Sequence, residues 1–275
     1  MDINKLLSGV DCSCGKTHTC DIKYVYIEKN AIERLKELCR NNHNLLIVAD
    51  ENTFAAAGEK TVAALAGKSI RKIIFSGAEI LVPNEAAICK VQNALSDVDL
   101  IVGIGSGVIN DIGKILSCVS GRKYIIVATA PSMDGYASDT SSMAIDGLKV
   151  PVDSRSADVI IGDLDILKNA PMHMMMSGLG DMLAKYVSIA EWRISHLING
   201  EYYCEAVAQL IRSAVAQCVN GAEGLLRREP QAVQAVFEGL VIGGVAMNYA
   251  GLSRPASGVE HYISHVLDMR GAEYG

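Results

Sequence analysis

Apolar and polar positions along the first part of the chain follow two alternating patterns. Short runs that are rich in β-branched residues or apolar on both faces predict strands at 22–27, 44–50, 72–75, 99–105, 124–130 and 158–167. Helical periodicity predicts helices over 31–41, 53–66 and 84–96, with Asn84 as the N-cap of the third, and a further helix from about 108. Buried strands separated by helices are typical of a mostly parallel sheet covered on both faces.

The pattern changes after residue 167. From about 170 onward it predicts only long helices, over 177–196, 202–226 and 230–250 and from about 257. We therefore predict an α/β domain over 1–165 and an all-helical domain over 166–275, with a functional site in the cleft between them.

Composition narrows the class of protein. The chain has 275 residues, 50% of them hydrophobic and 20% charged, which is enough apolar material for a sizeable core. A net charge of −6 argues against a nucleic-acid-binding surface. No signal peptide is apparent, and no run approaches the roughly 18–20 apolar residues of a membrane span. Five of the eight cysteines are scattered singly, which suits a reducing compartment, so we expect a cytoplasmic protein.

The stretch CSCGKTHTC places Cys12, Cys14, His18 and Cys20 within one short segment. These four residues could be drawn as zinc ligands. Structural zinc sites, however, favour two ligand pairs separated by a longer element, and this spacing packs every ligand into one loop. The favoured interpretation is a surface turn before the first strand.

A glycine-rich segment, IVGIGSGVINDIGK (101–114), lies where a strand is predicted to end and a helix to begin. Its glycines allow a sharp turn and close approach to a ligand, and a helix N-terminus offers free N–H groups to a phosphate. The spacing matches neither the nucleoside-triphosphate loop nor the usual dinucleotide fingerprint. A pyrophosphate site and a purely structural turn both remain open.

Asp50 ends the predicted strand 44–50. A carboxylate in this position can accept hydrogen bonds from the ribose hydroxyls of NAD and would repel a 2′-phosphate. It can equally serve as the cap of the helix that starts near Thr53. Position alone does not distinguish these roles.

Three polar side chains later in the chain are candidates for a metal site. Asp181 lies near the start of a helix on an otherwise apolar face, where a lone acid is usually a surface residue. His261 and His265 are four residues apart and therefore share one side of a helix. Single core histidines are common, but this pair at helical spacing favours a polar site.

Taken together, four segments resemble the superfamily of polyol and iron-type alcohol dehydrogenases, which includes glycerol dehydrogenase and dehydroquinate synthase. Within it they are most similar to the bacterial glycerol-1-phosphate dehydrogenase subgroup. The segments are GIGSGVINDIGK (103–114), ATAPSMDGYASDTSSM (128–143), SGLGDMLAKY (177–186) and SRPASGVEHYISHVLDM (253–269). The resemblance implies a Rossmann-like NAD(P) domain followed by a helical metal-binding domain, and a homo-oligomer, dimer or larger, for the full-length protein.

The resemblance also implies roles for individual residues. Those that would hold the pyrophosphate are Gly107, Val108, Ile109, Asn110 and Asp111. Those that would line the cofactor near the nicotinamide are Thr129, Ala130, Pro131, Ser132 and Ser138. The remaining roles fall to Asp50 at the adenosine ribose, Asp134 at the substrate, Asp181 and His261 as metal ligands, and His265 beside the substrate.

The implied reaction is reversible hydride transfer between NAD(P)H and dihydroxyacetone phosphate, giving sn-glycerol 1-phosphate. A divalent ion, zinc or nickel, would polarise the ketone and stabilise the alkoxide. Lys185 and Arg254 flank the motifs and are candidates for binding the substrate phosphate. The alternatives are glycerol or another polyol as substrate, a dehydroquinate-synthase-like cyclase, which Asp181 in place of the usual glutamate disfavours, and a non-enzymatic NAD-binding module.

The resemblance further implies a third metal ligand, a histidine, beyond Gly275. We therefore expect that the chain is truncated at its C-terminal end and that its helical domain is incomplete. Such a chain would expose apolar faces and bind metal weakly, and would be poorly soluble or inactive.

Overall fold

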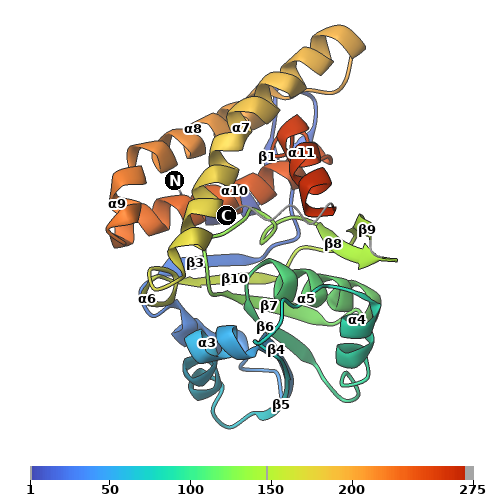
Figure 1. Ribbon diagram of the computed structural model, residues 1–275, viewed down its shortest axis with the longest axis vertical. Coiled ribbons are helices and arrows are strands. Elements are labelled where there is room, and N and C mark those ends of the chain that lie inside the picture. Colours follow the sequence, from blue (N-terminus) through green and yellow to red (C-terminus); the bar gives the residue numbers. More distant parts are fainter. Residues whose placement is uncertain (1, 147, 270–275) are drawn as a thin grey trace.

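The computed structural model describes residues 2–146 and 148–269, apart from the side chains of His265, Asp268 and Met269. The chain forms two lobes, an α/β lobe and a helical lobe, which lie one above the other in Figure 1. This is the order of classes that the sequence pattern predicts.

The α/β lobe is built on a six-stranded sheet in which every pair of neighbouring strands is parallel. Across the sheet the strands are β3 (Tyr24–Glu28), β10 (Val159–Asp163), β7 (Lys123–Ala128), β6 (Leu100–Gly105), β4 (Asn44–Asp50) and β5 (Ser69–Phe75). Each predicted strand corresponds to one of these. The central strands are buried on both faces, which explains their continuous apolar runs.

Helices cover both faces of this sheet (Figure 1). They are the 3₁₀ helix η1 (Ala31–Arg34) with α2 (Leu35–Leu38) and α3 (Glu51–Ala64) on one face, and α4 (Glu85–Gln92) and α5 (Gly107–Ser120) on the other. Asn84 caps α4 as predicted, because its side-chain oxygen accepts a hydrogen bond from the Ala87 N–H at 3.0 Å. The helix predicted over 31–41 is shorter, since α2 ends before the polar segment RNNHN (40–44).

Two short antiparallel hairpins were not predicted. They are β1 (Val10–Asp11) with β2 (Thr17–His18), and β8 (Thr140–Ile145) with β9 (Leu148–Asp153). The second hairpin is inserted between β7 and β10 and lies near the helical lobe in Figure 1. Its serine-rich first strand has little apolar alternation, so the pattern carried a weak strand signal.

The helical lobe follows β10. Its helices are α6 (Leu164–Leu167), α7 (Met172–Asn199), α8 (Glu205–Asn220), α9 (Ala222–Leu226), α10 (Pro230–Ala250) and α11 (Val259–Met269). Among the described residues no strand follows β10, as predicted. By length and composition α10 alone among the described helices could cross a membrane, but 72% of its apolar window is buried inside the molecule, as in a core helix.

The N-terminal segment contacts both lobes. The side chain of Asn4, in α1 (Ile3–Leu7), pairs with both backbone groups of Val25 on the edge strand β3, at 2.9 and 3.0 Å. The hydroxyl of Tyr249 in α10 donates to the carbonyl of Leu6. The residues before β3 therefore connect the edge of the sheet with the helical lobe. The predicted domain boundary at 165/166 stays a prediction.

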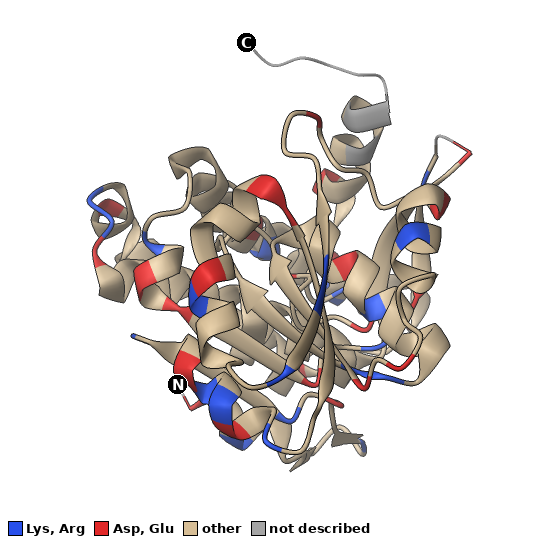
Figure 2. Cartoon of the chain, turned by 90° about the horizontal axis from the view of Figure 1, so that it is seen from below, with Lys and Arg blue, Asp and Glu red and all other residues tan. Residues whose placement is uncertain are grey.

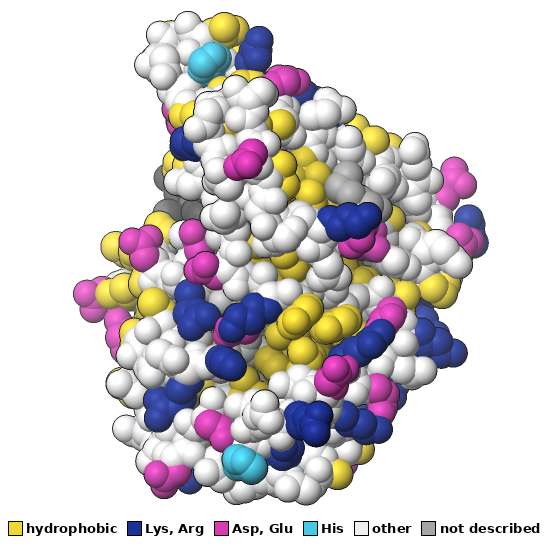
Figure 3. Space-filling view, turned by 180° about the vertical axis from the view of Figure 1, so that it is seen from behind, with side chains coloured by type: hydrophobic (Ala, Val, Ile, Leu, Met, Phe, Trp, Pro, Cys, Tyr) yellow, Lys and Arg dark blue, Asp and Glu magenta, His cyan; other side chains and the backbone are white. Residues whose placement is uncertain are grey.

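Charges of both signs are interspersed over the molecule (Figures 2 and 3). In Figure 3 hydrophobic side chains gather in a band near the middle of the visible face. Further apolar side chains are exposed on the helical lobe, namely Ile194, Leu197 and Ile198 on α7 and Tyr262 and Ile263 on α11.

Candidate active site

Two carboxylates and one ammonium meet where the loop after β7 contacts α7. The Nζ of Lys185 lies 2.8 Å from the Asp134 carboxylate and 3.0 Å from that of Asp181. The backbone N–H of Asp134 also donates to the Asp181 carboxylate at 2.8 Å. Lys185 and Asp181 lie one turn apart on α7, so one helix presents the acid together with the cation that neutralises it. The structure thus brings together Asp134 and Asp181, which are 47 residues apart in the sequence.

Lys185 is fully buried, and its surroundings explain how its charge is tolerated. Burial acts to lower the pKa of Lys185, but the carboxylates of Asp134 and Asp181 outweigh it, so the net shift is upward. Burial raises the pKa of Asp181, and the negative charge of Asp134 raises it further. The ammonium is therefore a fixed part of this buried network.

Glycine allows α7 to approach the loop so closely. A Cβ atom on Gly178 would lie 1.9 Å from the carbonyl oxygen of Pro131. A Cβ atom on Gly243 of α10 would lie 2.9 Å from the Lys185 side chain. Side chains at these positions would push the helices away from the loop that carries Asp134.

His261 joins this group from α11. Its Nε2 lies 3.9 Å from the Asp181 carboxylate, and its Nδ1 lies 3.0 Å from Oε1 of Glu260. Because an ionised carboxylate only accepts hydrogen bonds, Nδ1 donates to Glu260, and Nε2 is the nitrogen that faces Asp181. Metal bonds of about 2.0–2.2 Å to a carboxylate oxygen and to an imidazole nitrogen place the two ligand atoms about 3.4 Å apart in a tetrahedral site. The observed 3.9 Å lies about 0.5 Å above that distance, so a small rotation of either side chain lets Asp181 and His261 hold one divalent ion.

Glu260 is a site residue that the sequence motifs did not single out. Its Oε1 also accepts a hydrogen bond from the Gly258 N–H at 2.8 Å. Burial would raise the pKa of Glu260, but its hydrogen bonds with His261 and Gly258 outweigh this effect and the net shift is downward. A carboxylate that holds the second nitrogen of a histidine is the usual outer partner of a metal-binding imidazole.

The glycine-rich segment forms the predicted turn from strand β6 into helix α5. A Cβ atom on Gly105 would lie 2.6 Å from Ile109, and one on Gly103 would lie 2.4 Å from the Tyr124 hydroxyl. These contacts show that part of the glycine pattern serves packing of the turn itself. The N-terminus of α5, which begins at Gly107, opens next to the loop after β7, where the Ser106 and Ser132 hydroxyls are hydrogen-bonded.

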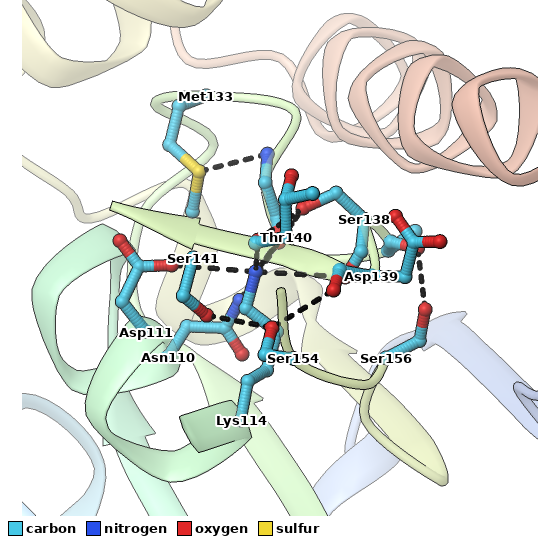
Figure 4. Close-up of polar contacts among 12 residues, drawn as sticks. Asn110, Asp111, Lys114, Met133, Ser138, Asp139, Thr140, Ser141, Ser154 and Ser156 are labelled. Atoms are coloured by element: carbon cyan, nitrogen blue, oxygen red, sulfur yellow. Dashed lines mark hydrogen bonds and ion pairs between the residues drawn. The ribbon is translucent and has the colours of Figure 1, made fainter. Parts of the chain in front are cut away.

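Lys114 of α5 holds the loop after β7 in place through hydrogen bonds. It was not predicted as a site residue. Figure 4 shows its ammonium reaching from α5 into the turn that precedes β8. It donates to the Gly135 carbonyl at 3.1 Å, to the Ser138 hydroxyl at 3.1 Å and to the Thr140 carbonyl, and it pairs with Asp111 at 3.3 Å. Burial lowers the pKa of Lys114 and raises that of Asp111.

The predicted cofactor residues differ in where their side chains lie. Thr129 and Ala130 line a pocket of about 320 Å³ together with Asn52, Thr53 and the start of α7. Ile109 and Asn110 are buried under the turn, and the Asn110 amide donates to the Gly135 carbonyl at 2.9 Å. The buried Ser138 hydroxyl donates to the Thr140 carbonyl at 2.9 Å.

Asp50 caps α3 in the structure. Its Oδ1 accepts a hydrogen bond from the Thr53 N–H at 2.9 Å, and its own N–H donates to the Thr53 hydroxyl at 3.1 Å. The helix-cap role that the sequence left open is therefore realised. Contact with a ribose stays a prediction.

Neither candidate for the substrate phosphate carries a free charge. Lys185 is held between two carboxylates, and Arg254 pairs with Glu201 at 3.1 Å. His265 lies in α11, but its side chain lies outside the described part of the chain.

Comparison with known proteins places this arrangement in a family. The family model for iron-containing alcohol dehydrogenases matches residues 26–171. The chain is 34% identical over 267 residues to the NAD(P)+ glycerol-1-phosphate dehydrogenase of Halalkalibacterium halodurans, covering 94% of this chain and 67% of that protein. It is 32% identical over 277 residues to the same enzyme of Bacillus licheniformis, covering 95% and 67%. The iron-containing alcohol dehydrogenase of Corynebacterium glutamicum superposes with a TM-score of 0.73 at 18% identity, covering 92% of this chain and 68% of that structure.

The family match and the two relatives define an oxidoreductase of the metal- and NAD(P)-dependent type that acts on CH–OH groups. The chain belongs to the iron-containing alcohol dehydrogenase family. It spans about two thirds of the length of the relatives that it matches. The predicted fold class, enzyme class and resemblance to glycerol-1-phosphate dehydrogenases are confirmed.

Proposed function

We propose that this protein catalyses reversible hydride transfer between NAD(P)H and dihydroxyacetone phosphate, giving sn-glycerol 1-phosphate. The observation that carries the proposal is the convergence of Asp134, Asp181 and His261 from three segments beside the glycine-rich turn. The names of the two relatives above support this substrate.

Asp181 and His261 are the proposed ligands of a divalent ion. Zinc and nickel both suit mixed carboxylate and imidazole ligation, and we propose one of them. When bound, such an ion supplies Lewis-acid polarisation of the ketone and stabilisation of the alkoxide. Glu260 fixes the orientation of the His261 ring, and Lys185 holds the Asp134 and Asp181 carboxylates in place.

The cofactor is proposed to lie along the carboxyl edge of the sheet. Gly107–Asp111 are the first five residues of α5, and the N–H groups at this helix start suit a pyrophosphate. Thr129–Ser132 follow β7 at the same edge, toward the nicotinamide. Asp50 can cap α3 through Oδ1 and accept from an adenosine ribose through its second oxygen.

Asp134 is proposed to contact the substrate, and His265, one turn after His261 on α11, is proposed to relay the proton. NAD(P)H would supply the hydride, and the His265 side or a water would supply the proton of the new hydroxyl.

The test is oxidation of NADH by the purified chain with zinc or nickel, comparing dihydroxyacetone phosphate with dihydroxyacetone. Turnover of the phosphate alone is expected, together with loss of about 100-fold or more in Asp181→Asn and His261→Ala. His173→Ala changes an exposed histidine on α7 and serves as the matched control. The proposed function predicts turnover where the sequence pointed to an inactive chain, so this assay decides between the two. Equal turnover of both substrates would favour a polyol dehydrogenase.

Binding of the metal and of NADH can be measured without turnover. We expect zinc or nickel to bind about 10- to 100-fold more weakly to Glu260→Gln than to the unaltered chain, measured by calorimetry. Suppose that the chain binds NADH but turns over neither substrate, and that Asp181→Asn binds metal as tightly as the unaltered chain. The protein would then be a nucleotide-binding module and no dehydrogenase.

A further inference from the structure

A second group of metal-ligating side chains lies far from Asp181 in the sequence and uses different chemistry. Cys12, Cys14, His18 and Cys204 place one ligand atom each within 4.8 Å of all the others. The sequence grouped Cys20 with the first three residues and favoured a plain surface turn. The structure places Cys204, 186 residues beyond His18, in the fourth position instead of Cys20. The segment does turn back on itself, in the β1–β2 hairpin.

Three of the six distances between the ligand atoms match a tetrahedral zinc site, and the other three are no longer than 4.8 Å. Zinc bonds of about 2.3 Å to sulfur and 2.0–2.1 Å to nitrogen place neighbouring sulfurs about 3.8 Å apart and a sulfur and a nitrogen about 3.6 Å apart. The Sγ atoms of Cys12 and Cys204 are 3.6 Å apart. The Nε2 atom of His18 lies 3.5 Å from the sulfurs of both Cys14 and Cys204.

The β1–β2 hairpin presents three of the ligands. Its turn is closed by hydrogen bonds from the Cys12 N–H to the Lys16 carbonyl at 3.1 Å and from the Gly15 N–H to the Cys12 carbonyl at 3.0 Å. Gly15 has a φ of +86°, a conformation that other residues rarely adopt, and it lets the chain reverse directly after Cys14. The backbone of this hairpin is therefore arranged around its ligands.

Cys204 enters from the helical lobe as the N-cap of α8. Burial raises the pKa of the Cys204 thiol, and the positive end of the helix dipole opposes this shift. The hydroxyl of Tyr202 lies 3.3 Å from the Cys14 sulfur, where it can donate a hydrogen bond to a thiolate.

The orientation of His18 is set by a group that can only accept a hydrogen bond. Its Nδ1 lies 2.9 Å from the backbone carbonyl of Tyr249, so Nδ1 carries the proton and the Nε2 lone pair faces the sulfurs. The ring is buried and stacks on the Tyr249 ring at 5.1 Å. A metal-binding histidine held by a backbone carbonyl is the outer-shell arrangement typical of zinc sites.

We propose that Cys12, Cys14, His18 and Cys204 bind one structural zinc ion that joins the N-terminal hairpin to the helical lobe. Four protein ligands fill a tetrahedral site and leave no position for substrate. Three thiolates select zinc over the hard cations that a carboxylate site would also take. This site is separate from Asp181 and His261, and the proposal does not depend on the proposed function.

Cobalt substitution tests the proposal because thiolate ligands give cobalt(II) a near-ultraviolet charge-transfer band and tetrahedral sites give intense visible bands. The full 275-residue chain loaded with cobalt should show both, whereas the Asp181/His261 site has no thiolate. Cys12→Ser and Cys204→Ser should lose the charge-transfer band or shift it strongly, and zinc content should fall by about one ion per chain. Cys20→Ser, the matched control from the same segment, and Asp181→Asn should keep the band.

Alkylation of the unaltered chain gives a second measurement that does not require the variants to fold. Bound zinc should protect Cys12, Cys14 and Cys204 from iodoacetamide, mapped by mass spectrometry, and leave the exposed Cys89 and Cys118 as reactive as before. The proposal is overturned by a cobalt-loaded chain without a thiolate band. Equal reactivity of the three cysteines with and without zinc, or a Cys12–Cys204 disulfide in the freshly purified chain, would overturn it too.

Discussion

At the scale of single residues, a buried ammonium holds two carboxylates together where the loop after β7 meets α7. Replacing Lys185 with methionine would leave Asp134 and Asp181 buried beside each other without a cation. Breaking a buried ion pair by removing one partner costs about 3–5 kcal/mol. We expect Lys185→Met to lower the free energy of unfolding by about this amount at pH 8, as measured by urea denaturation.

The pH dependence of this loss has a definite sign. Burial and the charge of Asp134 already raise the pKa of Asp181, and removing Lys185 raises it further. A carboxyl group whose pKa is raised by folding stabilises the folded state below its unfolded pKa, and this contribution disappears as the pH rises through the folded pKa. Lys185→Met should therefore lower the free energy of unfolding less at pH 5 than at pH 8. Lys168→Met, which breaks a partly exposed pair with Asp165, should cost under about 1 kcal/mol at either pH. Equal losses in the two variants would contradict a buried network.

How far the residues of the site can be predicted depends on what marks them in the sequence. Asp134, Asp181 and His261 lie in motifs with a family resemblance, and the structure brings them together. Glu260 lies inside one of these motifs, next to His261, but residue type and spacing alone do not distinguish a carboxylate that orients an imidazole from an ordinary surface acid. Cys204 lies outside the motifs, because its role follows from partners that only folding brings near. Lys114, which anchors the loop before β8, is hidden for the same reason: its acceptors at Gly135–Thr140 lie more than 20 residues away.

At the scale of elements, the fit of α7 against the loop after β7 rests on one glycine. The backbone of α7 contains both Gly178, buried against the Pro131 carbonyl, and Gly180, which has open space where a Cβ would stand. Gly178→Ala should lower the free energy of unfolding by about 1–3 kcal/mol, because the helix must move off the loop. Gly180→Ala, two residues away on the same helix, should raise it by up to about 1 kcal/mol through helix propensity.

Thermal and urea unfolding of the two variants check this pair directly. The same displacement of α7 should move Asp181 away from Asp134, so Gly178→Ala should also bind metal more weakly while Gly180→Ala does not. If both substitutions stabilise the protein, α7 does not need to lie this close to the loop after β7.

Elements with strong periodicity were predicted well, and those defined by partners were not. The bounds of β4 and α10 match the predicted 44–50 and 230–250, because each contains a dense apolar pattern with clear limits. The hairpin β8–β9 has a polar first strand, and β1–β2 has only two residues in each strand. Such short or polar strands are stabilised by what they pack against, which the local pattern does not contain.

At the scale of the whole molecule, the two lobes share one hydrophobic core. Phe237 of α10 lies edge-on to Tyr136 of the loop after β7 at 5.2 Å. The same ring lies where a Cβ atom on Gly162 of β10 would stand, 2.4 Å away. The sequence predicted the two lobes separately. It could not predict this contact, because complementary shapes on distant segments leave no periodic signal.

The single tryptophan makes the coupling of the lobes measurable. Trp192 is fully buried in the helical lobe, where its Nε1 donates to the Tyr202 carbonyl at 2.6 Å, and the chain has no other tryptophan. Its fluorescence therefore reports the helical lobe, whereas far-ultraviolet circular dichroism reports both lobes. Because the core is continuous, we expect both signals to change at the same urea concentration in one cooperative transition.

Leu197→Ala, at an exposed position near the end of α7, should leave both midpoints unchanged. Phe237→Ala should lower stability by about 3–5 kcal/mol and shift both midpoints. A tryptophan transition that precedes the dichroism change in the unaltered chain would mean that the lobes unfold independently, despite the packing of Phe237.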